Sequence, residues 1–525
     1  MKNILLILFV TLVPLFSTAQ KYDNIWITGN FDNVHTTEPW LGNSVINFNT
    51  APTTIYYESH NMSFHRAYAS ICNPATGRLL FYTNGIYIAD STNAMMQNGD
   101  SINFDPNFRP GYNFWQANKR DGYDDVGNAF VLPKPNSSTE FYLFHKTLVI
   151  YTLPELASTI PDVLSHQIKQ SLIDMSRNNG RGRVVYKNLP LAGMDSVTSF
   201  AAVKHANGRD WWIVGQQFRM QQFFIGLLTP NGFEYSHTQT FPNIYRRSYR
   251  VGIGSNALFS PDGSKLAIYD LMHSTYLFNF DRCTGNLSNY RHIPFPDTLY
   301  SQGGVCFSPN SRYLYSVTQF EYVHQYDTDA TDILSTDQIV AVNDSFMYAP
   351  VPSVNPAYII MQQFIRPMLA PNGKIYICAA GGFNYLTTIE NPDIGSIGCN
   401  VQQHSVYLPT FNDETLPNYV NYRLGAMLGS GCDTLTVATL NPIKKSTQIQ
   451  LFPNPTSDEI TLQTPDDLAA ASLQITDVFG RVLRQETLVA GANKWSVRDL
   501  PQGVYVVRIA TATKTLETTK FTVAR

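Results

Sequence analysis

The sequence contains few charged residues and has almost no net charge. Asp, Glu, Lys and Arg make up 15% of the 525 residues, and the formal net charge is −3. A net charge this close to zero does not suggest nucleic acid or an anionic membrane surface as a partner. We therefore expect no nucleic-acid partner, and a surface rich in Asn, Ser, Thr and Tyr that suits contacts with glycans or proteins.

The sequence also lacks the short motifs of common catalytic centres. It has no Gly-x-Ser-x-Gly nucleophile elbow, no His-Glu-x-x-His zinc helix, no Walker glycine loop and no paired-cysteine zinc spacing. These absences exclude enzymes whose site lies within one such motif. They do not exclude a site gathered from several loops, and they make no cofactor evident.

Cysteine is scarce, with six residues in the whole chain. An even number in an exported protein permits disulfides. Cys306 and Cys378 fall beside or inside predicted strands, where a thiol acts as a small apolar filler. The pair that we expect to form a disulfide is Cys399 with Cys432.

Long apolar runs are limited to the start of the chain. Lys2 precedes an apolar run over residues 4–16, and small residues follow at positions 17–19. This pattern is typical of a secretory signal peptide over residues 1–19. No later stretch is long and uncharged enough to form a membrane-spanning helix, so we expect no transmembrane segment.

One turn pattern recurs between residues 20 and 432. In Ser260-Pro261-Asp262-Gly263, proline fixes the first turn position, Asp tolerates the next, and glycine supplies a positive φ before an apolar strand. Such units start roughly 50 to 70 residues apart, the length of a four-stranded propeller blade with variable loops. Residues 20–432 are thus predicted to form an all-β propeller of about seven blades, within a range of six to eight. Residues 22–57 and 401–427 would share the closing blade. The six units are 73–78, 133–139, 206–210, 260–265, 308–312 and 370–374.

A helical pattern competes with strands over residues 153–177. Apolar residues recur there at roughly helical spacing, but Pro161 interrupts the pattern. We expect a loop or short helix inserted within a blade, either as a plain surface excursion or as a lid over the propeller face.

Aromatic residues provide the candidate ligand contacts. Tyr112, Phe114 and Trp115 lie in a loop rich in Gly and Asn, which favours exposure. Trp211 and Trp212 lie on a predicted blade strand, where a tryptophan can either pack in the core or stack on a sugar ring at the channel mouth.

Three carboxylates are spaced closely enough to consider a metal ion. Asp327, Asp329 and Asp332 could converge on a hard cation such as Ca²⁺, although the full Asp-x-Asp-x-Asp-Gly loop is missing. The alternative is a solvated hairpin turn.

The tail over residues 448–525 is separated from the propeller region by an expected linker at 433–447. It contains short runs rich in β-branched and aromatic residues, separated by Pro or Gly, and is predicted to be a small immunoglobulin-like β-sandwich. The residues that define its motifs are Pro453, Asn454, Pro455, Asp477, Gly480, Arg481, Leu500, Gly503, Tyr505 and Lys520.

These motifs, in this order, resemble the type A C-terminal sorting domain of the type IX secretion system of Bacteroidota. The Ser-Pro-Asp-Gly units resemble the WD40-like repeats of bacterial propellers. The resemblance implies transport by the type IX machinery to the cell surface or the medium, removal of the tail and attachment to an anionic lipopolysaccharide. The resemblance of the propeller carries no known activity, and the rigid face of a propeller favours binding of a surface glycan or protein without catalysis. The alternative is a hydrolase or lyase acting on glycans or peptides with a dispersed site in the channel.

Overall fold

The computed structural model describes most of the chain after the expected signal peptide. Residues 1–19 and 434–449 lie outside the described part, and the second range includes all of the expected linker except residue 433. The described residues are 20–29, 39–64, 67–104, 122, 127, 129–151, 162–217, 221–242, 244, 256–270, 274–294, 302–348, 360–433, 450–464, 471–477, 481–489, 491–510 and 515–525.

The chain divides into two compact units, residues 1–436 and 437–525. Both are built from antiparallel strands, which confirms the predicted all-β fold. Helical structure in the described residues is confined to short 3-10 turns. These are η1 (Pro39–Leu41), η4 (Asn178–Gly180), η5 (Leu334–Thr336) and η6 (Ser396–Cys399).

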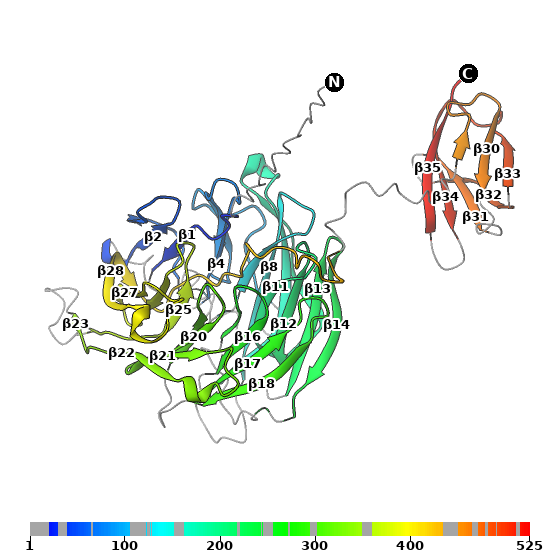
Figure 1. The fold of residues 1–525 in the computed structure, drawn as a ribbon. Coiled ribbons are helices and arrows are strands. Elements are labelled where there is room, and N and C mark those ends of the chain that lie inside the picture. Colours follow the sequence, from blue (N-terminus) through cyan, green and yellow to red (C-terminus); the bar gives the residue numbers. More distant parts are fainter. Residues whose placement is uncertain are drawn as a thin grey trace, which may run out of the picture. The chain divides into compact units, whose positions relative to one another are not determined.

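The described residues of the first unit form seven sheets of three or four strands, arranged around a common axis like the blades of a propeller (Figure 1). The first sheet contains β1 (Ile25–Thr28), β2 (Asn43–Asn47) and β3 (Thr54–Glu58), and the second contains β4 (Ala69–Cys72), β5 (Leu79–Thr83) and β6 (Ile88–Asp90). The third contains β7 (Ala129–Pro133), β8 (Glu140–Tyr151), β9 (Asp162–Asp174) and β10 (Arg183–Asp195). The fourth contains β11 (Val197–Lys204), β12 (Trp211–Gln217), β13 (Gln222–Thr229) and β14 (Gly232–Thr240).

The remaining blades repeat this plan. The fifth sheet contains β15 (Asn256–Phe259), β16 (Lys265–Asp270), β17 (Ser274–Phe280) and β18 (Leu287–Pro294). The sixth contains β19 (Gly303–Phe307), β20 (Tyr313–Thr318), β21 (Tyr322–Asp327) and β22 (Gln338–Val342). The seventh contains β25 (Arg366–Leu369), β26 (Ile375–Cys378), β27 (Phe383–Ile389) and β28 (Val401–Asn412), and β23 (Met347–Tyr348) pairs separately with β24 (Ile360–Met361).

The repeated turns form as their residue types require. Gly263 adopts a φ of +74°, a region that glycine enters without steric cost. The Ser260 hydroxyl donates to Asp262 Oδ1 at 2.6 Å and accepts from the Lys265 backbone N–H at 3.0 Å. Because Ser260 is fully buried, these two bonds satisfy its polar side chain and fix the hairpin between β15 and β16.

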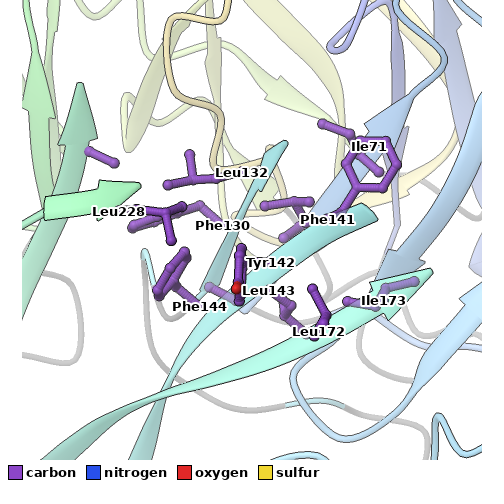
Figure 2. Close-up of a cluster of buried hydrophobic side chains, with 14 of the residues drawn as sticks. Ile71, Phe130, Leu132, Phe141, Tyr142, Leu143, Phe144, Leu172, Ile173 and Leu228 are labelled. Atoms are coloured by element: carbon purple, nitrogen blue, oxygen red, sulfur yellow. The ribbon is translucent and has the colours of Figure 1, made fainter. Parts of the chain in front are cut away.

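Apolar side chains fill the space between neighbouring blades. Figure 2 shows one such cluster, in which Ile71 of β4 and Leu228 of β13 lie on either side of β8 residues. Phe130 and Phe144 pack with ring centroids 5.6 Å apart, and Phe130 also meets Phe200 of the next blade at 4.7 Å. This packing holds consecutive sheets together by burial of apolar area.

The expectation of a loop or short helix over residues 153–177 is wrong for its second half. Residues 162–174 form β9, which pairs with β8 on one side and β10 on the other. The long hairpin supplies backbone hydrogen bonds on both edges, and Ile168 and Ile173 are fully buried. Tertiary pairing therefore outweighs the local helical spacing. Residues 152–161 lie outside the described part.

The second unit is a β-sandwich of two sheets. One contains β29 (Gln450–Phe452), β30 (Glu459–Thr464) and β33 (Gly491–Ser496). The other contains β31 (Ser472–Thr476), β32 (Val482–Thr487), β34 (Gly503–Ala510) and β35 (Thr515–Val523). Ile460, Leu462, Leu473 and Ile509 are fully buried between the sheets, as the sequence predicts.

Candidate functional site

The segment over residues 413–433 runs through the channel of the propeller, and we call it the plug. At its start, the Glu414 N–H donates to Ala379 O at 3.0 Å, beside the first residue of inner strand β25. Near its end, the Met427 N–H donates to Ala206 O at 2.8 Å, in the turn that follows inner strand β11. The plug thus enters the channel near the first residues of the inner strands. It leaves the channel near the turns that follow the inner strands. In Figure 1 it is the gold trace that leaves β28 and crosses the propeller.

This path corrects the expected closing blade. Residues 401–412 belong to β28 in the seventh sheet, and β1–β3 form a first sheet of their own. The first and seventh sheets contact each other directly, where the Thr410 N–H of β28 donates to Ser44 Oγ of β2 at 3.1 Å. The plug lies beside β1 and β4 without a ladder of backbone hydrogen bonds.

The plug contributes large side chains to the propeller core. Leu416 packs with Trp26 and Tyr376, and Tyr422 packs with residues of the third and fourth blades. The Tyr422 hydroxyl donates to Val131 O at 2.8 Å, and the Tyr419 hydroxyl donates to Ile25 O at 2.9 Å. Burial raises the pKa of both phenols well above the usual range, so both remain neutral donors.

Polar side chains of the plug are bonded to the surrounding blades. Asn418 Nδ2 donates to Ala129 O at 3.1 Å, and Asn421 Nδ2 donates to Pro261 O at 2.5 Å. Arg423 forms two hydrogen bonds with Asp23, at 2.7 and 2.6 Å. These groups therefore fix the plug in place.

A cavity of about 300 Å³ remains beside the plug. Inner strands β11, β15, β19 and β25 form one side, and Tyr419, Asn421 and Arg423 of the plug line the other. Most of the wall is apolar or amide in character. Within the described residues the lining contains one carboxylate, Asp23, which is paired with Arg423, and no histidine. Among the described residues, the lining does not bring together two carboxylates, or a histidine and a carboxylate, which are the pairs typical of hydrolysis by a dispersed site. The lining residues contributed by the inner strands include Phe200, Ala257, Phe259, Phe307, Arg366 and Met368.

The two candidate tryptophans are buried. Trp211 is 1% and Trp212 is 4% exposed, so neither ring offers a face for stacking on a sugar. Trp212 Nε1 donates to Arg282 O at 2.8 Å, and Lys204 Nζ lies 4.1 Å from the centroid of the Trp211 ring. Trp212 therefore joins the fourth and fifth blades, and Trp211 packs against Tyr422 of the plug with ring centroids 6.1 Å apart. Tyr112, Phe114 and Trp115, the other aromatic candidates, lie outside the described part of the chain.

The three candidate metal ligands do not converge. Asp327 pairs with Arg312 at 2.7 Å, Asp329 pairs with Lys265 at 2.9 Å, and Asp332 Oδ1 accepts from the Leu334 N–H at 3.2 Å. The ion pair lowers the pKa of Asp327. No group of three His, Cys, Asp or Glu side chains that could hold a metal ion occurs in the described residues. The hairpin-turn interpretation accounts for these carboxylates.

The expected disulfide between Cys399 and Cys432 is wrong. Cys432 is bonded to Cys283, in the turn between β17 and β18, and Cys399 is a buried free thiol. The plug carries Cys432 across the channel, away from Cys399 in the seventh blade. The spacing of the cysteines in the sequence does not predict the path of the plug across the channel.

The tail motifs build the β-sandwich. The Asn454 side chain donates to Lys520 O at 3.1 Å and accepts from the Thr522 N–H at 2.9 Å, which ties the Pro453–Pro455 entry to β35. Tyr505 stacks on Phe521 with ring centroids 5.5 Å apart. Asp477 pairs with Arg481 at 3.1 Å, Leu500 is 6% exposed, and Gly503 begins β34. Gly480 lies outside the described residues.

The molecule is therefore a β-propeller with an internal plug, followed by a separate β-sandwich. Residues 450–524 match the family described as the secretion system C-terminal sorting domain, which confirms the predicted type IX sorting domain. Export to the cell surface or the medium follows from this domain. Among the described residues, no helix has the length and apolar character needed to cross a membrane.

Matches among solved structures include two bacterial proteins. The periplasmic gluconolactonase PpgL of Pseudomonas aeruginosa has 12% identity and a TM-score of 0.41, and the match covers 75% of this chain and 99% of that one. PorZ, a surface component of the type IX secretion system of Porphyromonas gingivalis, has 13% identity and a TM-score of 0.29, with 92% and 68% covered. These values assign no activity to this chain. No match is found among curated proteins.

Proposed function

We propose that this protein is a non-enzymatic binding module that acts outside the cell. The type IX machinery carries it through the outer membrane, after a signal peptide at residues 1–19 has directed it to the periplasm. At the outer-membrane surface of a Bacteroidota cell, the tail is removed and the propeller is joined to an anionic lipopolysaccharide. There it binds a surface glycan or a protein.

The observation that supports binding over catalysis is the plug. It fills the part of the channel where a dispersed catalytic site would form, and its amides and arginine are bonded to the blades. Within the described residues, the remaining cavity presents apolar, aromatic and amide groups, the guanidinium groups of Arg366 and Arg423, and one carboxylate paired with Arg423. Such a lining suits recognition of a small ligand group.

The propeller activity is tested with the full mature chain. Short oligosaccharides and short peptides are screened for binding by calorimetry, and each mixture is analysed by mass spectrometry for cleavage. We expect binding without turnover. The variant Ala257→Phe should weaken binding by filling the cavity, whereas Ala75→Phe on an exposed turn should not. Turnover that the wild type shows and Ala257→Phe lacks would favour the hydrolase or lyase.

Delivery is tested separately in the native host by mass spectrometry of cells and medium, with and without residues 448–525. We expect the wild-type protein to lose its tail near residue 448 and the truncated protein to stay in the periplasm. Surface delivery of the truncated protein would contradict the proposal.

A further inference from the structure

The turn between β17 and β18 holds the end of the plug by two adjacent residues. Cys283 forms the disulfide with Cys432, 149 residues later in the chain. Arg282, the preceding residue, donates from Nη2 to Gly425 O at 2.5 Å. The covalent bond and the hydrogen bond therefore act on the same end of the plug.

Arg282 also joins the fourth and fifth blades. Its Nε donates to Lys204 O at 2.8 Å, and its Nη2 donates to His205 O at 3.2 Å. The residue is 6% exposed, and burial lowers the pKa of its guanidinium. A buried guanidinium is stabilised only when its N–H groups find acceptors, and here three backbone carbonyls provide them. Removing the plug would take away one of these acceptors.

Residues near Arg282 leave space for the plug and hold the turn between β17 and β18 in place. A Cβ on Gly208 would lie 2.6 Å from the Ala426 backbone nitrogen, and Gly208 has a φ of +72°, so only glycine fits. The Asp281 side chain accepts from the Cys283 N–H and from the Thr284 hydroxyl, both at 2.8 Å. These contacts present Arg282 and Cys283 to the plug from a rigid turn.

We infer that Arg282 and Cys283 form a latch that locks the plug in the channel. The latch keeps the channel closed at the end where the turns after the inner strands lie. The plug forms one side of the cavity, so the latch sets how much of the channel a ligand can enter. A dithiol reductant breaks the disulfide, which is the covalent part of the latch. It transfers two electrons and two protons to the Cys283–Cys432 bond, leaves two thiols and becomes a cyclic disulfide.

The latch is tested by hydrogen–deuterium exchange of residues 20–525, with the sorting domain retained, with and without dithiothreitol. In the oxidised protein we expect protection of the hydrogen-bonded amides of the plug, such as those of Met427 and Ser430. Reduction should raise the exchange rate of residues 425–433 by about tenfold or more, because the end of the plug then opens locally. The sorting domain has no cysteine, so strands β34 and β35 provide an internal control that should not change.

Two variants separate the latch from general destabilisation. Arg282→Ala should raise exchange at residues 425–433 even in the oxidised protein. Arg312→Ala, which removes an arginine that pairs with Asp327 at the surface, should leave this region unchanged. If Arg282→Ala does not fold, reduction of the folded wild type still decides the question. Rapid exchange of the Met427 amide in the oxidised protein, or unchanged exchange of residues 425–433 after reduction, overturns the inference.

Discussion

Arg423 and Asp23 form a two-bond ion pair although 400 residues separate them in the chain. Asp23 precedes β1, and Arg423 lies in the plug, so the pair joins the beginning of the propeller to its end. The Asp23 side chain is 8% exposed and the Arg423 side chain 33%. Two parallel N–H···O bonds to a mostly buried carboxylate give the pair a defined geometry that a lysine cannot reproduce.

Replacing Arg423 should destabilise the propeller. We expect Arg423→Ala to lower the free energy of unfolding by about 2 kcal/mol, because it leaves the Asp23 carboxylate without its charged donor. Arg423→Lys should recover only part of this loss. Urea denaturation of Arg423→Ala, Asp23→Ala and the double variant measures the coupling. The exposed pair Arg498–Asp458 of the sorting domain is the matched control, with a coupling of about 0 to 1 kcal/mol. Additive effects at Arg423 and Asp23 would contradict the expected coupling.

The plug offers two leucines in opposite environments. Leu416 is fully buried, and Leu428 is 77% exposed. Leu416→Ala should lower the free energy of unfolding by about 3 kcal/mol, because it leaves a cavity between Trp26 and Tyr376. Leu428→Ala should change it by less than about 0.5 kcal/mol. Equal effects of the two substitutions in thermal denaturation would show that the plug does not lie in the channel.

The blades could be predicted from the sequence, whereas the plug could not. The residue types of the turn at Ser260–Gly263 determine its backbone conformation without help from distant residues. The recurrence of such turns along the sequence therefore indicates the spacing of the blades. The plug has neither strand alternation nor helical periodicity. Its bonds, such as Tyr422 to Val131, join residues far apart in the chain. The same limit explains the disulfide, because the partner of Cys432 depends on where the plug leaves the channel.

The cysteine arrangement gives a direct chemical prediction. Without reductant, unfolded protein should expose four thiols, and proteolysis should yield one linked peptide pair containing Cys283 and Cys432. In the folded protein, Cys72, Cys306 and Cys378 should react slowly with iodoacetamide. Burial raises the pKa of each of these thiols to about 12 and also blocks access. Peptide mapping by mass spectrometry measures both results. A peptide linking Cys399 to Cys432 would contradict the path of the plug.

His145 should make the stability of the propeller depend on pH. It is fully buried, its Nδ1–H donates to Asn103 Oδ1 at 2.6 Å, and its Nε2 accepts from the Ser171 hydroxyl at 3.0 Å. The bond that Nε2 accepts requires the neutral ring, because both nitrogens of a protonated ring are donors. Burial, with a smaller contribution from Lys169, lowers the pKa of His145 to about 3. In the unfolded chain the pKa returns to about 6.5. Below pH 6.5 the unfolded state therefore binds a proton that the folded state does not, and the free energy of unfolding falls as the pH falls.

The fall should continue down to about pH 3, with a slope of up to about 1.4 kcal/mol per pH unit from this residue. Urea denaturation at a series of pH values between 7.5 and 4 measures the slope. Other buried groups also contribute, so the informative quantity is the difference between the wild type and His145→Gln. Glutamine keeps one donor and one acceptor but does not titrate, and the variant should show a shallower slope even though it is less stable at pH 7. Identical slopes would mean that His145 takes up its proton equally in the folded and unfolded states, which the hydrogen bond accepted by Nε2 does not allow.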